Sequence, residues 1–261
     1  MRIAANLSLL YAHLPLEARF DAAARDGFRA VEILFPYDRS PAWYADALRA
    51  SGLAPVLINT PVEEGAGSHG WAARPGDEAR FRSGLDRALE VAQTIGCARI
   101  HLMAGRTADL PQLLCQSAFT DNLALASARA EQARITLMLE PLNRADVPGY
   151  FYHRPEQALA ILRTLDSPWL RLQFDFYHCM KEGLVLADEL ARARGWIGHA
   201  QIAGVDGRHE PDLSMHGLQA AVQQLQQQGD SEWLGFEYRP RTTPPAGLAW
   251  CEPLLAAGIL A

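Results

Sequence analysis

Short apolar runs rich in valine, isoleucine and leucine alternate along the chain with stretches whose apolar residues recur at every third or fourth position. The first pattern is typical of buried strands and the second of amphipathic helices. The chain is therefore predicted to alternate strands and helices. The predicted strands span residues 3–8, 30–34, 55–60, 99–104, 135–142, 170–177, 197–204 and 233–238.

One of the predicted helices illustrates the pattern. Phe81, Leu85, Leu89 and Ala92 fall on one helical face, and Gly96 follows where a helix would end. Eight near-continuous apolar strands, each followed by a helix, favour a (β/α)8 TIM barrel in the α/β class. An open dinucleotide-binding sheet would carry G-x-G-x-x-G after its first strand, whereas this chain reads NLSLLYAHLP there.

Composition narrows the picture further. A chain of 261 residues with 49% hydrophobic residues can bury one large core, so residues 1–261 are predicted to form a single domain. The net charge of −6 argues against nucleic acid as a partner. The four cysteines form no C-x-x-C pair, and the first residues are too polar for a membrane span, so we expect reduced thiols and a cytoplasmic protein.

Polar residues end four successive predicted strands. Glu140, Asp175, Gln201 and Glu237 occupy these positions, where the chemistry of a TIM barrel is located. Three converging carboxylates repel one another unless a cation lies between them. Three carboxylates and one amide carbonyl suit Mg²⁺ or Mn²⁺ better than zinc, so one divalent ion is the expected cofactor.

Each of these residues also has a purely structural interpretation. A single Asp or Glu at a strand end is often a helix N-cap or a salt-bridge partner. His178 could be a hydrogen-bonded structural residue, and His101 and His199 are expected to be structural because they lie deeper in their strands. Arg208 follows the seventh strand and could bind an anion or remain an ordinary loop residue.

Several motifs, in the same order along the chain, resemble the hydroxypyruvate isomerase family, which includes the 2-oxo-tetronate isomerases and belongs to the xylose-isomerase-like TIM barrels. The resemblance extends from residue 2 to about residue 250. It rests on RIAANLSLL, GFRAVEILFPYD, HLMAG, LEPLNRADVPGYF, DFYH, HAQIAGVDGRHEPD and GFEYRPR. The segments 105–111 and 212–219 depart from the family pattern and are expected near the mouth of the barrel.

The resemblance implies a metal-dependent isomerisation of a small hydroxy-oxo acid in carbohydrate metabolism, such as hydroxypyruvate to tartronate semialdehyde. By matching motifs, the metal ligands would be Glu140, Asp175, Gln201 and Glu237. Glu140 and Glu237 would also exchange the proton, while His178 and Arg208 would contact the substrate. Removal of a proton beside a carbonyl gives an enediolate, which such a site is suited to stabilise.

Other functions remain open. A ketose 3-epimerase or a related sugar isomerase would use the same metal ligands, and a non-catalytic sugar-acid binding protein could use the same fold. An apurinic endonuclease on this fold would need several metal ions and a basic DNA groove. A homo-oligomer is compatible with the sequence.

Overall fold

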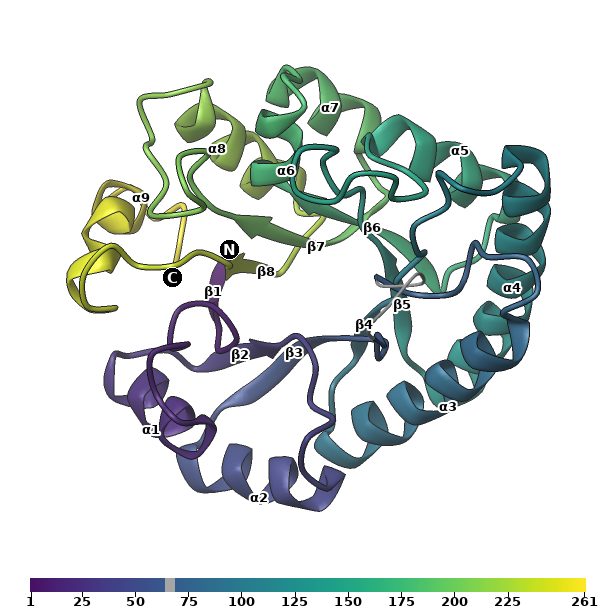
Figure 1. Cartoon of the computed structure of the whole chain (residues 1–261). Helices are drawn as coiled ribbons and strands as arrows, with labels where there is room; N and C mark the ends of the chain where they lie inside the picture. Colours follow the sequence, from purple (N-terminus) through teal and green to yellow (C-terminus); the bar gives the residue numbers. More distant parts are fainter. Residues whose placement is uncertain (64–68) are drawn as a thin grey trace.

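The computed structural model describes residues 1–63 and 69–261. Its centre is a closed barrel of eight parallel strands in chain order, in which β1 pairs with β8 (Figure 1). The TIM-barrel prediction is therefore confirmed. The strands are β1 (Arg2–Asn6), β2 (Ala30–Ile33), β3 (Ala54–Asn59), β4 (Arg99–His101), β5 (Thr136–Leu139), β6 (Leu170–Asp175), β7 (Ile197–Ile202) and β8 (Trp233–Phe236).

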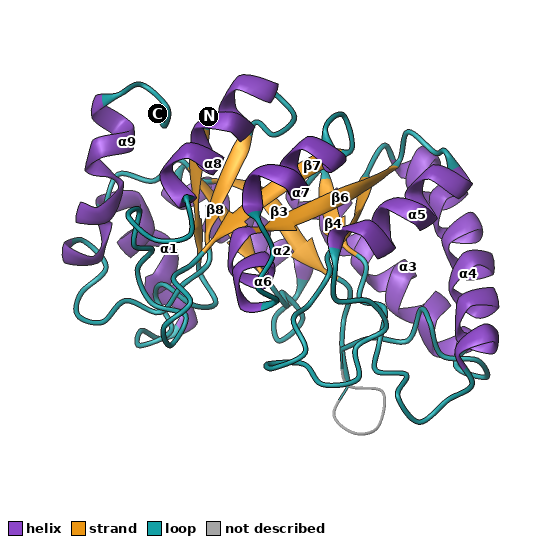
Figure 2. Cartoon of the chain, turned by 90° about the horizontal axis from the view of Figure 1, so that it is seen from above, coloured by secondary structure: helices purple, strands orange, loops and turns teal. Residues whose placement is uncertain are grey.

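Helices surround the barrel on its outer side, as Figures 1 and 2 show. They are α1 (Leu16–Arg25), α2 (Pro41–Ser51), α3 (Glu78–Ile95), α4 (Gln112–Ala133), α5 (Pro155–Leu165), α6 (Phe176–Lys181), α7 (Leu186–Ala193), α8 (Leu218–Gln228), the 3-10 helix η1 (Ala246–Cys251) and α9 (Glu252–Ala256). None of the described helices is long and apolar enough to cross a bilayer.

The local sequence explains how these helices dock. In α3, the predicted stripe of Phe81, Leu85, Leu89 and Ala92 is buried against the barrel. The helix ends at Gly96, which has a φ of 75° and adopts the left-handed conformation that glycine tolerates best. Burial of the stripe supplies the main driving force for docking, because removal of apolar surface from water dominates folding.

Except after β6, which α6 follows directly, the connections that follow the strands are longer than those that precede them, so the longer loops gather at one end of the barrel (Figure 2). This is the end at which the predicted site residues leave β5, β6, β7 and β8. The divergent segment 105–111 lies in the loop that follows β4, and the segment 212–219 covers the end of the loop that follows β7 and the first two residues of α8. This end is the mouth of the barrel.

Each predicted strand runs one to three residues past its observed end, and in the sixth strand this changes the element to which the residues belong. The sixth strand stops at Asp175, and Phe176, Tyr177 and His178 belong to α6. The proline-containing segment 241–250, RTTPPAGLAW, is typical of a loop in sequence, but the structure forms η1 from Ala246 onward. The segment from Pro61 to Gly76 has no regular apolar pattern and is predicted to be a loop that carries Glu64; its described part has no helix or strand, and Glu64 lies outside the described residues. All four cysteines are free and buried.

Candidate active site

Three polar side chains from two neighbouring strand ends meet at the mouth of the barrel. Glu140 directly follows β5, Asp175 ends β6 and His178 lies in α6. Each can offer one ligand atom such that the three atoms lie within 4.8 Å of one another, and all three residues are buried. This group can hold a metal ion.

The two oxygens of Asp175 have different partners. Oδ1 accepts a hydrogen bond from the backbone N–H of Tyr177 at 2.8 Å and so caps the start of α6. Oδ2 lies 3.5 Å from Nε2 of His178 and 3.5 Å from Nη2 of Arg208. Burial raises the pKa of Asp175 to about 7, although the positive charge of Arg208 opposes this shift. Asp175 is therefore both an N-cap and a candidate ligand.

Glu140 is fixed through one of its oxygens. Oε2 accepts a hydrogen bond from Nε2 of Gln173 at 2.8 Å and lies 2.9 Å from Nδ1 of His101. Oε1 lies 3.6 Å from Nε2 of His178. Because the hydrogen bond from Gln173 holds Oε2, Oε1 is left to face Asp175 and His178.

The ring of His178 is oriented by the loop after β5. The backbone N–H of Asn143 donates to Nδ1 of His178 at 3.0 Å, so Nδ1 is an acceptor. Burial, with a smaller contribution from Arg208, lowers the pKa of His178 well below its ordinary range, so the ring is neutral and Nε2 carries the proton. A metal ion needs the lone pair of a nitrogen, so within this group Glu140 and Asp175 are the candidate ligands, while His178 presents a hydrogen-bond donor beside them.

Glu237 and Arg208 form the charged contact on the other side of Asp175. Nη2 of Arg208 lies 2.8 Å from Oε2 of Glu237, and the guanidinium carbon lies 4.8 Å from the ring centroid of Tyr177. Burial raises the pKa of Glu237 well above its ordinary value, although Arg208 opposes the shift. Burial alone would lower the pKa of Arg208, but the charges of Glu237 and Asp175 outweigh it and raise that pKa.

Gln201 lies in β7 with no exposed surface. Its Oε1 accepts a hydrogen bond from Nε2 of Gln173 at 2.5 Å, and its Nε2 donates to Oε2 of Glu32 at 2.9 Å. Gln173 also donates a hydrogen bond to Glu140, so it connects the amide of Gln201 to the cluster of Glu140, Asp175 and His178.

The donor set fits a hard divalent cation. Buried carboxylates are costly without compensating charge, and Arg208 is the cation that contacts Asp175 and Glu237. Two of the four predicted ligands, Glu140 and Asp175, lie directly together. Glu237 joins them through Arg208, and Gln201 joins them through Gln173.

Sequence reasoning missed three residues that shape this site. Glu32 and Gln173 were visible as polar residues inside predicted apolar strands, a signal that could have found them. Asn143 contacts Nδ1 of His178 through both its backbone N–H and its side-chain Nδ2, and the backbone contact is one that no side-chain pattern shows. His101 and His199, which are predicted to be structural, are both buried within strands; His101 lies beside Glu140 and His199 beside Glu32.

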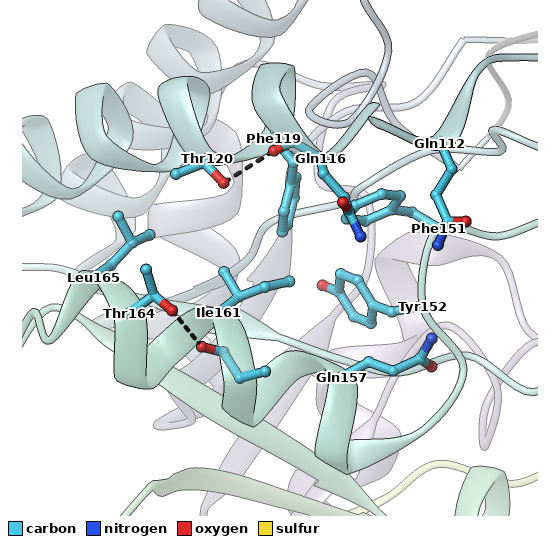
Figure 3. Close-up of a pocket in the computed structure, with 11 residues that line it drawn as sticks. Gln112, Gln116, Phe119, Thr120, Phe151, Tyr152, Gln157, Ile161, Thr164 and Leu165 are labelled. Carbon is cyan, nitrogen blue, oxygen red and sulfur yellow. Dashed lines mark hydrogen bonds between the residues drawn. The ribbon is translucent and has the colours of Figure 1, made fainter. Parts of the chain in front are cut away.

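A cavity of about 400 Å³ lies outside the barrel, between α4 and α5 (Figure 3). Its lining includes Phe119 and Gln116 from α4, Ile161 from α5, and Phe151 and Tyr152 from the preceding loop. None of the predicted site residues lines it. The cavity is separate from the cluster of Glu140, Asp175 and His178 at the mouth.

Comparison with known proteins extends the resemblance seen in the sequence. The family described as "Xylose isomerase-like TIM barrel" matches residues 20–254. The 2-oxo-tetronate isomerase of Cupriavidus necator is 44% identical over 97% of this chain and 98% of its own length. The hydroxypyruvate isomerase of Escherichia coli is 32% identical over 97% of this chain and 99% of its own length.

A crystal structure of a protein from Brucella melitensis, named as an AP endonuclease of family 2, superposes with a TM-score of 0.90. It is 36% identical and covers 97% of this chain and 98% of that chain. The two full-length relatives above are named as isomerases, which supports an enzyme of isomerase type. By sequence identity, coverage and fold, the chain belongs to the hydroxypyruvate isomerase family within the xylose isomerase-like TIM barrels.

Proposed function

We propose that this chain is a metal-dependent isomerase of a small hydroxy-oxo acid, acting through an enediolate. The observation that carries the proposal is the buried group of Glu140, Asp175 and His178 at the mouth, with Arg208 beside it. Between the two acids, the 44% identity to a 2-oxo-tetronate isomerase favours 2-oxo-tetronate over hydroxypyruvate.

The residues of the site would have three roles, which are metal binding, proton transfer and substrate binding. Glu140, Asp175, Gln201 and Glu237 would hold one Mg²⁺ or Mn²⁺, which when bound supplies positive charge to stabilise the enediolate. Glu237 and Glu140 would remove a proton from one carbon and return one to its neighbour. The Nε2–H of His178 would donate to a substrate oxygen, and Arg208 would bind the substrate carboxylate.

The name of the Brucella protein suggests a second candidate, action on abasic DNA. Two features of this chain weigh against it. The net charge of −6 does not favour a polyanion, and among the described residues Glu140, Asp175 and His178 form the single group of three acidic, histidine or cysteine side chains with metal-ligand geometry. A ketose 3-epimerase remains a further candidate, which Arg208 disfavours because a free ketose has no carboxylate.

Proton NMR in D₂O tests these candidates directly. The Mg²⁺-loaded protein is incubated separately with 2-oxo-tetronate, hydroxypyruvate and fructose, and a gel assay follows cleavage of an abasic oligonucleotide. We expect isomer formation with deuterium incorporated beside the carbonyl of an oxo acid. Reaction of fructose alone would identify an epimerase, cleavage of the oligonucleotide would identify an endonuclease, and no reaction with any substrate would favour a binding protein.

A further inference from the structure

A second buried polar cluster lies next to Gln201, centred on Glu32 of β2. Oε2 of Glu32 accepts hydrogen bonds from Nδ2 of Asn6 at 2.9 Å and Nε2 of Gln201 at 2.9 Å. Nε2 of His199 lies 2.5 Å from Oε1. Glu32, His199, Gln201 and Asn6 have no exposed surface, so these contacts compensate for the burial of the carboxylate.

Strand β8, which pairs with β7, leaves space for the carboxylate of Glu32. Gly235 of β8 pairs with Gln201, and a Cβ built on Gly235 would lie 1.9 Å from Oε1 of Glu32. Any larger residue at position 235 would therefore displace Glu32 or the strand. A glutamate inside β2 and a glycine opposite it in β8 together place the carboxylate against Gln201.

This contact determines which end of the Gln201 amide faces Gln173. A carboxylate accepts hydrogen bonds but does not donate them, so Glu32 pairs with the NH₂ end of Gln201. The carbonyl oxygen then faces Nε2 of Gln173, which also donates to Glu140. The opposite orientation would set the carbonyl of Gln201 against the carboxylate of Glu32 and two NH₂ groups against each other.

Only the carbonyl end of an amide can bind a hard cation. We propose that Glu32 is a positioning residue. It holds Gln201 so that the carbonyl oxygen of Gln201 is turned toward the cluster of Glu140, Asp175 and His178 at the mouth. This inference rests on the proposed metal site. Glu32 acts through Gln201 and contacts neither the ion nor the substrate.

The test is the affinity for Mn²⁺ of the full chain, measured by titration calorimetry without substrate. Glu32→Gln keeps the shape of the side chain but can offer either a donor or an acceptor to Gln201, so the preferred orientation is lost. We expect the affinity to fall by about 10–100-fold with an unchanged circular dichroism spectrum. A parent protein that does not bind Mn²⁺ overturns the proposed metal site, whereas equal affinities of parent and variant overturn only the role of Glu32.

A matched control separates orientation from general loosening of the barrel. Asn6→Ala removes a donor from the same oxygen of Glu32 but leaves the contact between Glu32 and Gln201 intact. We expect this variant to unfold at a lower temperature and to bind Mn²⁺ with an affinity near that of the parent. A loss of affinity equal to that of Glu32→Gln would overturn the orientation argument.

A paired exchange provides a rescue. The double variant combines Glu32→Gln with Gln201→Glu. Residue 201 then carries two carboxylate oxygens, so either of its orientations presents an oxygen toward Gln173, and the side-chain NH₂ at position 32 can donate to the other oxygen. We expect this double variant to regain most of the affinity lost in Glu32→Gln. If Glu32→Gln alone does not fold, the double variant is compared with the parent: near-parental affinity supports the role of Glu32, and weak binding overturns it.

Discussion

Glu237 is the carboxylate that contacts Arg208 most closely, and its burial favours the protonated form. A group that can hold a proton beside a substrate is suited to general acid–base chemistry. Glu237→Gln keeps the size of the side chain and removes this capacity. We expect turnover of the oxo acid to fall by about 10²–10⁴-fold, measured by NMR, with an unchanged circular dichroism spectrum.

The control for this variant is Glu232→Gln. Glu232 lies just before β8, where it is exposed and forms an ion pair with Arg2 at 2.9 Å. Exposed ion pairs contribute little to stability, so turnover and folding are expected to match those of the parent. Near-normal turnover of Glu237→Gln would contradict a mechanism that uses two carboxylates.

At the level of strands and helices, the hydrophobic pattern predicted all eight strands but placed each of their ends one to three residues too late, including the end of the sixth. Phe176 and Tyr177 are apolar in sequence and buried in the structure, so burial does not distinguish strand from helix there. The deciding feature is the cap that Asp175 forms with the N–H of Tyr177. A cap of this kind depends on the geometry of one side chain, which the pattern does not contain.

The sequence also predicted only part of the candidate site. The barrel rule places strand ends together, and Glu140 and Asp175 do lie together in the structure. The contact between Glu32 of β2 and Gln201 of β7 joins residues 169 positions apart across the closed barrel. Such a contact depends on barrel closure and side-chain direction, so a single sequence reveals only the unusual polar residue in an apolar strand.

The close approach of β8 to Glu32 leads to a prediction about stability. Gly235→Ala would place a methyl group against Oε1 of Glu32, which His199 also contacts. We expect the free energy of unfolding to fall by about 1–3 kcal/mol, measured by urea denaturation.

Gly84→Ala is the matched control for that substitution. Gly84 lies inside α3, and an added Cβ would meet Cγ of Pro61 at 3.4 Å, an ordinary contact. Alanine favours a helix interior over glycine by roughly 0.5–1 kcal/mol, so this variant is expected to gain stability. Equal effects of the two substitutions would contradict the tight packing of Gly235.

For the molecule as a whole, the barrel brings Glu140, Asp175 and Glu237 into one buried region, and this placement couples folding to pH and metal. The pKa of Asp175 rises from 3.8 to about 7, chiefly through burial. Between these values the folded chain holds a proton that the unfolded chain has released, so the stability of the metal-free protein falls as pH rises through this window. A bound cation favours the charged carboxylate and opposes this loss.

We therefore expect Mn²⁺ to raise the unfolding temperature more at about pH 8 than at about pH 5, as measured by scanning calorimetry with and without a chelator. Asp175→Asn provides the control, because asparagine can still cap α6 but does not titrate. Without metal, the stability of this variant should fall less than that of the parent between pH 3.8 and about pH 7. If both proteins lose stability equally over this window, Asp175 is not the group that couples folding to pH, and its burial does not oppose its charge.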